Sequence, residues 1–342
     1  MSTATTDYRI RPPSPSDWPS IHRLFELSLG SDRPPGWWEW KHEQNPFGES
    51  YWLIAEADGQ VVGARAFLKW QWRFDGWPFL ATRPVDTATH PDWRRRGIFT
   101  NLTKQMVEHI TNEGVDLIFN TPNSMSRPGY LKMGWSDVTR IPVWFKPLRP
   151  FSIASTLLID NDEVNGNTGD DPDFSQSNID RFFAESPIET ICHSAWKREQ
   201  RLHTPRSLHY FDWRYRQIPG ITYRAAWAGD ADSGAFVVYR RRDRKELKEI
   251  MLSETVATPD VRGVTLLRRL LSHVASTEDA HHMIACTARN TPAMWALTLS
   301  GFLHLPRAGL NLVCRPLSPD AKSARLTHWS NWRAAIGDLE IF

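Results

Sequence analysis

The sequence predicts a mixed α/β fold (α/β, α+β class) in two similar halves, each with a central mixed sheet flanked by helices. Three observations predict it. Segments with the period of a strand alternate with segments with the period of a helix. A set of residue pairs recurs at a nearly constant offset, which indicates an internal repeat. Between the halves, residues 160–178 are poor in apolar side chains, as a linker would be.

The bulk composition excludes several classes of protein. The chain has 342 residues, 41% of them hydrophobic and 23% charged, which is typical of a globular protein with two domains. A net charge of +2 provides no general attraction to nucleic acids or anionic membranes. No run approaches eighteen apolar residues, the N-terminus does not resemble a signal peptide, and the three cysteines form no metal-type pair. We therefore expect a cytoplasmic protein with no membrane span, no nucleic-acid partner and no metal; a homo-oligomer is left open.

The elements of the first half follow from periodicity and turn residues. Ser14 to Gly30 carries apolar residues on one helical face and ends in a glycine. Strands are predicted where apolar alternation is bounded by Asp-Gly turns or by helices, at residues 51–57, 61–74, 77–89, 115–120 and 138–146. The remaining helices are predicted after Gly97 and around residue 130.

A basic loop opens the helix that follows Gly97. Arg94, Arg95 and Arg96 precede this glycine, and the apolar stripe that starts at Ile98 recurs every four residues. A helix N-terminus offers free backbone N–H groups and a positive dipole end, and glycine lets a ligand approach the backbone closely. The loop therefore predicts a site for a polyanion, most simply a pyrophosphate.

A second motif lies further along the chain, with Asn123, then Tyr130, then Gly134 and Trp135. In this order the two motifs resemble motifs A and B of the GCN5-related N-acetyltransferases, the GNAT superfamily. The chain departs from the family pattern at Phe99, where Gly or Ala is usual. The resemblance implies acetyl-CoA as co-substrate and direct transfer of its acetyl group to an amine in a ternary complex.

The resemblance also implies roles for individual residues. Tyr130 would donate a proton to the departing CoA thiolate. For the proton of the amine, Asp86 is the first candidate acceptor and His90 the second, and a structural hydrogen bond is the alternative for Asp86. Trp37, Trp38 and Glu39 are candidates for contact with the acceptor. The expected cofactor contacts are Thr87, Ala88, Thr89, Arg94, Arg95, Arg96, Gly97, Ile98, Thr100 and Asn123.

The second half repeats the first with weakened motifs. Four features recur at offsets of 173, 171, 168 and 167 residues: Trp40 and Trp213, Gly63 and Gly234, Pro91 and Pro259, Asn123 and Asn290. The basic loop is reduced to Val261-Arg262-Gly263, and Leu297 stands where the first copy has Tyr130. We therefore expect a tandem arrangement whose second copy is not catalytic. The basic run Arg240–Lys245 is expected at a hairpin tip.

These observations divide the chain into a catalytic domain (1–148), a linker (149–179), a degenerate GNAT-like domain (180–316) and a C-terminal tail (317–342). The tail resembles the ending of tandem acetyltransferase-like proteins associated with cell-envelope sugars. In the related enhanced-intracellular-survival acetyltransferases the C-terminal carboxylate reaches the active site, so a role for the Phe342 carboxylate is a further hypothesis.

The predicted function is an acetyl-CoA-dependent N-acetyltransferase of a small amine, with amino sugars or aminoglycoside-like acceptors favoured. Two alternatives remain open. The enzyme could use another acyl-CoA or transfer the acyl group to oxygen, or the protein could be a non-catalytic acyl-CoA sensor.

Overall fold

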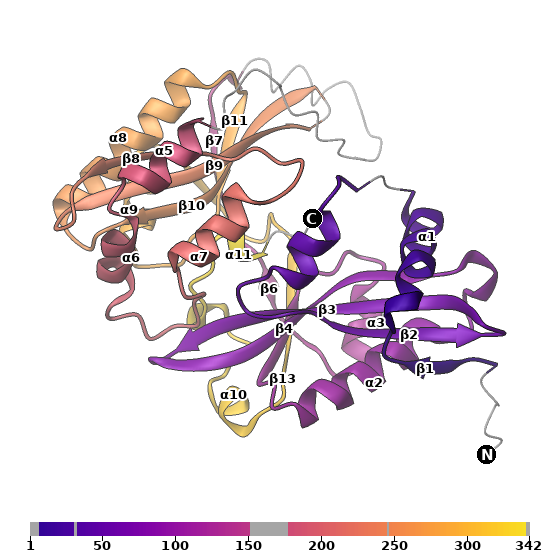
Figure 1. Ribbon diagram of the computed structural model, residues 1–342. Helices are drawn as coiled ribbons and strands as arrows, with labels where there is room; N and C mark the ends of the chain where they lie inside the picture. Colours follow the sequence, from indigo (N-terminus) through magenta and orange to yellow (C-terminus); the bar gives the residue numbers. More distant parts are fainter. Residues whose placement is uncertain (1–6, 31–32, 151–176, 245, 340–342) are drawn as a thin grey trace.

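The computed structural model describes residues 7–30, 33–150, 177–244 and 246–339. Two sheets lie side by side, each covered by helices (Figure 1). The first sheet has the strand order β1-β2-β3-β4-β5-β13-β6, and the second sheet has the order β12-β7-β11-β10-β9-β8. The mixed α/β fold with two sheets is therefore confirmed.

The strands of the first sheet are β1 (Arg9–Arg11), β2 (Tyr51–Ala57), β3 (Gln60–Phe74), β4 (Trp77–Thr89), β5 (Leu117–Asn120), β6 (Ser136–Arg140) and β13 (Asn311–Pro316). Those of the second are β7 (Val143–Pro147), β8 (Arg224–Gly229), β9 (Gly234–Arg244), β10 (Leu247–Ala257), β11 (His282–Ala285) and β12 (Leu303–Leu305). The first-half helices are α1 (Trp18–Leu29), α2 (Ile98–Asn112) and α3 (Arg127–Lys132). The later helices are α5 (Ser177–Glu185), α6 (Ile188–Trp196), α7 (Leu208–Phe211), α8 (Val261–Thr277), α9 (Pro292–Leu299), α10 (Pro319–Ser323) and α11 (Ile336–Leu339).

Helices cover both faces of the first sheet because β2 and β3 carry apolar side chains on both sides. Ile54 and Ala64 pack with α1, whereas Leu53 and Phe67 pack with α2 and α3. Gly30 ends α1 with a left-handed φ of 62° and donates its N–H to the Glu26 carbonyl, as its sequence position predicted.

The two sheets exchange a strand. Residues 138–146 were expected as one closing strand of the first half, and that expectation is wrong. The chain forms β6 in the first sheet and then passes to the second sheet as β7, antiparallel to β11. In return, β13 from the second half inserts between β5 and β6 of the first sheet. The domain boundaries at residues 148 and 180 remain a prediction. The two sheets are not divided at these boundaries, because β7 and β13 each pair with strands of the other half.

A pseudo-twofold relation supports the internal repeat. Trp40 and Trp213 lie in equivalent single π-turns, Glu39–Glu43 and Asp212–Arg216. Their rings stack at 5.2 Å, and each indole N–H donates to the other residue's carbonyl oxygen at 2.7 Å. Two residues at an offset of 173 therefore meet each other in the core, as paired elements of a tandem duplication would.

The C-terminal tail forms hydrogen bonds with both halves of the chain. α11 lies between the sheets (Figure 1), and Arg83 of β4 donates hydrogen bonds to the carbonyl oxygens of Asp338 and Leu339. From the second half, Arg206 binds the Asp338 carboxylate at 2.8 Å, and Arg214 donates to the Gly337 carbonyl at 3.2 Å. The end of a helix is a favourable place for cations. Phe342 lies outside the described residues.

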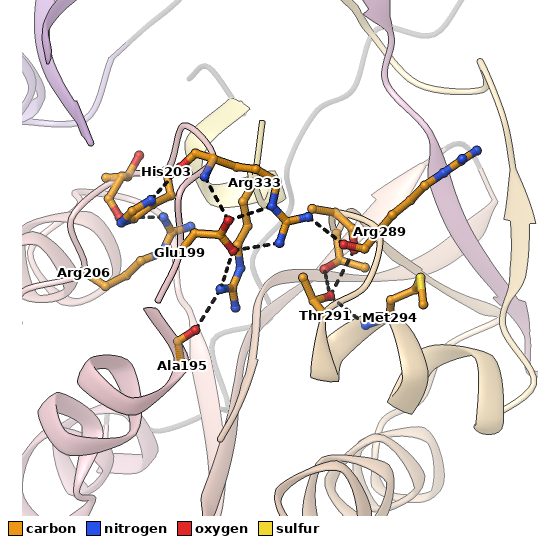
Figure 2. Close-up of polar contacts among 12 residues, drawn as sticks. Ala195, Glu199, His203, Arg206, Arg289, Thr291, Met294 and Arg333 are labelled. Atoms are coloured by element: carbon orange, nitrogen blue, oxygen red, sulfur yellow. Dashed lines mark hydrogen bonds and ion pairs between the residues drawn. The ribbon is translucent and has the colours of Figure 1, made fainter. Parts of the chain in front are cut away.

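A second set of contacts fastens the segment before α11 (Figure 2). Glu199 binds Arg201 at 2.7 Å and Arg333 at 2.9 Å, and Arg333 also donates to the Ala195 carbonyl. Burial alone would raise the pKa of the Glu199 carboxyl, but the hydrogen bond from Arg201 and the charge of Arg333 outweigh it and lower that pKa to about 2.

Glu199→Gln is expected to lower the free energy of unfolding by about 1–3 kcal/mol at pH 7. The carboxyl has a lower pKa in the folded than in the unfolded chain, so its stabilisation is complete above about pH 4.5 and is lost as the pH falls towards 2. Thermal unfolding between pH 7 and pH 3 checks this. The gap between the two proteins should narrow with acid, and a gap independent of pH would contradict the assignment.

Candidate functional site

The N-terminus of α2 has the geometry of an anion site. Gly97 precedes the helix with φ 78°, and no side chain caps the helix start. The first intrahelical hydrogen bond runs from Asn101 N to the Gly97 carbonyl. The N–H groups of Ile98, Phe99 and Thr100 come before it and therefore have no acceptor within the helix.

The three loop arginines surround this helix start with exposed side chains. Arg96 stacks over Trp93 at 4.4 Å and lies 3.8 Å from the Asp7 carboxylate. Arg95 has a left-handed φ of 63°, which turns the chain into the helix. The loop therefore combines positive charge with free backbone donors, as its sequence predicted.

Gly63 sets the distance between α2 and the sheet. A Cβ at this position would lie 2.5 Å from the Ile98 side chain and 3.3 Å from Leu102. The absence of a side chain lets the helix start pack directly on β3.

Strands β4 and β5 diverge next to this helix. They pair in parallel only at Ala81–Leu117 and Thr82–Ile118, after which β4 continues without β5 to Thr89. The predicted cofactor residues Thr87, Ala88 and Thr89 lie on this free stretch. Arg83 donates to the Thr121 hydroxyl at 3.2 Å, so it bridges the gap beside α11.

Tyr130 sits on α3 with a side chain that is almost fully buried. Its ring packs edge-on against Phe99 and Trp135. Its hydroxyl oxygen accepts a 2.7 Å hydrogen bond from Arg65, a residue that the sequence analysis did not single out. Asn123, at the other end of the motif, is exposed and accepts hydrogen bonds from the backbone and hydroxyl of Ser126.

Asp86 is the extra residue of a β-bulge in β4, where the register with β3 shifts, and its φ is 25°. Its carboxylate is 2.6 Å from Lys41 Nζ and 3.2 Å from His42 Nε2, with a side chain only 5% exposed. Burial would raise the pKa of this carboxyl, but the Lys41 charge and the His42 hydrogen bond hold it well below its usual range. A carboxylate held in this way is a weak base, so the geometry favours the structural role left open for Asp86.

His90, the second candidate for the proton of the amine, lies at the end of β4, where its Nδ1 accepts a hydrogen bond from Asp92 N at 3.4 Å.

The three candidate acceptor contacts lie in different surroundings. Trp37 is buried and lines a cavity of 1110 Å³. Trp38 is half-buried, stacks on His22 and His42, and packs against the core beside α1. Glu39 is exposed, and neither Trp38 nor Glu39 lines the cavity.

The cavity lies between the first half and the face of the second sheet. Thr121 and Leu339 border it, so it reaches the end of β5 and the tail. Its ionisable lining among the described residues comprises Arg33, Arg140, Arg240, Arg242, Asp243, Glu249 and His282. The run Arg240–Lys245 was expected at a hairpin tip. Its described residues are the last of β9, where Arg244 pairs with Leu247 of β10, so the run does lead into a hairpin, although Arg240 at its start is buried.

Within this lining, Arg242, Glu249 and His282 form a row across three strands. They are register partners on β9, β10 and β11. Glu249 binds Arg242 at 2.5 Å and His282 at 2.9 Å. Among the described residues of the cavity wall, four arginines face two acids, and one of these acids is bound in this row.

The start of α8 is capped, unlike the start of α2. Val261-Arg262-Gly263 was expected as a reduced loop, but these residues form the first turn of α8. The Asp260 carboxylate caps that helix by accepting from Gly263 N at 2.8 Å. A carboxylate thus occupies the position that a phosphate would take, and the absence of catalysis in the second half remains a prediction.

Among residues 7–30, 33–150, 177–244 and 246–339, no three His, Cys, Asp or Glu side chains gather in a metal-binding group. No helix in the described part of the chain is long and apolar enough to cross a membrane.

Comparison with known proteins agrees with this geometry. Residues 9–138 match the family model of the acetyltransferase (GNAT) domain. A search of curated proteins found no match.

Three solved structures share the fold at low identity. A probable N-acyltransferase from Enterococcus faecalis is 13% identical with a TM-score of 0.63, and the match covers 92% of this chain and 73% of the other chain. Eis1 from Mycobacterium abscessus is 16% identical with a TM-score of 0.53, covering 94% and 76%. The Saccharomyces cerevisiae N-myristoyltransferase with bound myristoyl-CoA is 10% identical with a TM-score of 0.51, covering 92% and 80%.

The uncapped start of α2 lies within the residues that match the acetyltransferase (GNAT) domain. Residues 9–138 match the GNAT domain model, and a second sheet lies beside the sheet that this domain forms.

Proposed function

We propose that this protein is an acetyl-CoA-dependent N-acetyltransferase that acts on a small amine by direct transfer. The observation that carries the proposal is the uncapped start of α2 between three exposed arginines, next to a strand edge that β5 leaves free. Guanidinium and backbone N–H donors suit a pyrophosphate, and the free stretch of β4 suits an extended pantetheine arm.

In this proposal the amine nitrogen attacks the thioester carbonyl carbon and the C–S bond breaks. Tyr130 donates its hydroxyl proton to the sulfur. The amine loses its proton to water, because Asp86 is bound by Lys41 and His42. Asn123 would contact the pantetheine, and Thr87 to Thr89 would hold the acyl group.

The acceptor would enter the cavity lined by Trp37. Because arginines outnumber acids on its described wall, we propose an amine that also carries a carboxylate or phosphate, such as an acidic amino sugar, in preference to a polycationic aminoglycoside. A longer acyl-CoA is the second candidate donor, since a neighbour of the same fold holds myristoyl-CoA.

The experiment is a thiol-release assay over a panel of amines, with matched pairs that differ only in a carboxylate or phosphate. We expect release with acetyl-CoA and an anionic amine, and calorimetry should show one CoA per chain because Asp260 caps the second helix. Binding of CoA without release for any amine would favour a sensor, and absence of CoA binding would reject the proposal.

A further inference from the structure

Arg65 is a buried guanidinium at the centre of the proposed site. It lies in the middle of β3 with a side chain 0% exposed, on the face that packs against α2 and α3. Its Nη2 donates to the Tyr130 hydroxyl oxygen at 2.7 Å, and its Nη1 donates to the Thr87 hydroxyl at 2.7 Å. It therefore links the candidate acid to the free edge of β4.

No carboxylate neutralises this guanidinium within the part of the chain that the structure describes. Its surroundings are aromatic: the rings of Phe67, Phe99 and Tyr130 lie 5.1, 4.6 and 5.6 Å from its central carbon. Burial of an unpaired charge is costly, so a position of this kind needs a compensating role. The chain departs from the family motif at Phe99, and the stacking of the Phe99 ring on Arg65 explains this departure.

The direction of the hydrogen bonds orients the phenol. Arginine has only donors, so the Tyr130 oxygen must accept from it and the Tyr130 proton must point elsewhere. Among the described residues, no acceptor for that proton is found. The Tyr130 O–H is therefore held ready to donate to a bound molecule.

We propose that Arg65 is a positioning residue that aims the Tyr130 hydroxyl at the sulfur of acyl-CoA and stabilises the oxygen after its proton leaves. When the C–S bond breaks, its electron pair goes to sulfur, the sulfur takes the Tyr130 proton, and the phenolate is left beside Arg65. The proton released by the amine reaches Tyr130 through solvent and restores it. This inference rests on the proposed function.

The first test is a double-mutant cycle on kcat with Arg65→Met, Tyr130→Phe and the double variant. If Arg65 acts through Tyr130, Arg65→Met lowers kcat about tenfold or more, and the double variant is no slower than Tyr130→Phe. Losses that multiply in the double variant would overturn the proposal. Arg65→Gln also removes the charge and gives the same cycle if the Met variant does not fold.

The second test needs no turnover. Wild-type protein should bind CoA about fivefold more tightly than desulfo-CoA, because Tyr130 donates to the sulfur, and Arg65→Met should lose this preference. Arg333→Met is the matched control, because Arg333 is also a buried arginine but is bound to Glu199 outside the site. If no amine is acetylated, the proposed function fails, whereas this preference still tests Arg65. Equal binding of CoA and desulfo-CoA by the wild type would reject the proposed role of Arg65.

Discussion

Replacing Arg94, Arg95 and Arg96 by Gln is expected to raise the dissociation constant of acetyl-CoA about 30-fold. Each exposed guanidinium contributes about 0.5–1 kcal/mol to phosphate binding, and 1.4 kcal/mol corresponds to a factor of ten. The kcat at saturating acetyl-CoA should stay unchanged, because Tyr130 is held by Arg65, Phe99 and Trp135. Calorimetry with CoA measures the first quantity and steady-state kinetics the second.

Salt provides an independent check on this prediction. Binding to wild-type protein should weaken as ionic strength rises, and the triple variant should show a flatter dependence. The control is a triple Gln variant of Arg198, Arg268 and Arg269, which are exposed in the second half and change the net charge equally. If the control loses as much affinity, the effect comes from overall charge and the loop is not the phosphate site.

Tyr130→Phe is expected to lower kcat at least about tenfold, at the low end of what a positioned general acid provides. Affinity for CoA should change only a few-fold, because the ring still packs against Phe99 and Trp135. Thiol release under saturating acetyl-CoA is the measurement.

Tyr239→Phe is the matched control for the loss of a buried hydroxyl. Tyr239 is buried in the second half, where its hydroxyl donates to Glu278 at 2.8 Å. This variant should lower thermal stability and leave kcat intact. Full activity of Tyr130→Phe would show that another group protonates the sulfur.

Much of the architecture could be predicted from local pattern. The Asp-Gly turns and apolar alternation placed β2, β3 and β4 at nearly their observed bounds, since these signals depend on neighbours in the sequence. The basic loop before Gly97 also lies at a helix start as predicted, and Tyr130 lies beside Phe99 of that helix. Roles for these residues remain proposals.

The strand exchange could not be predicted in the same way. Periodicity shows that residues 143–147 form a strand, but it carries no information on which sheet receives that strand. β6 and β7 are separated by only a short bend, so the pattern looked like one continuous element.

The surroundings of Arg65 and Asp86 could not be predicted from the sequence, because tertiary contacts set them. The sequence does not show that Lys41 and His42 bind the Asp86 carboxylate in the folded chain. One signal could have identified Arg65: it alternates with Gly63 and Phe67 on the same face of a strand, where a charge is out of place.

The exchanged strands have a consequence for biosynthesis. Until the ribosome has made residue 316, β6 lacks the strand it pairs with and β5 presents a bare edge. A nascent chain that stops before that point would hold an incomplete sheet, a surface prone to aggregation or chaperone capture. Maturation should therefore be late and cooperative, with both halves closing in a single step after translation of the distal strand.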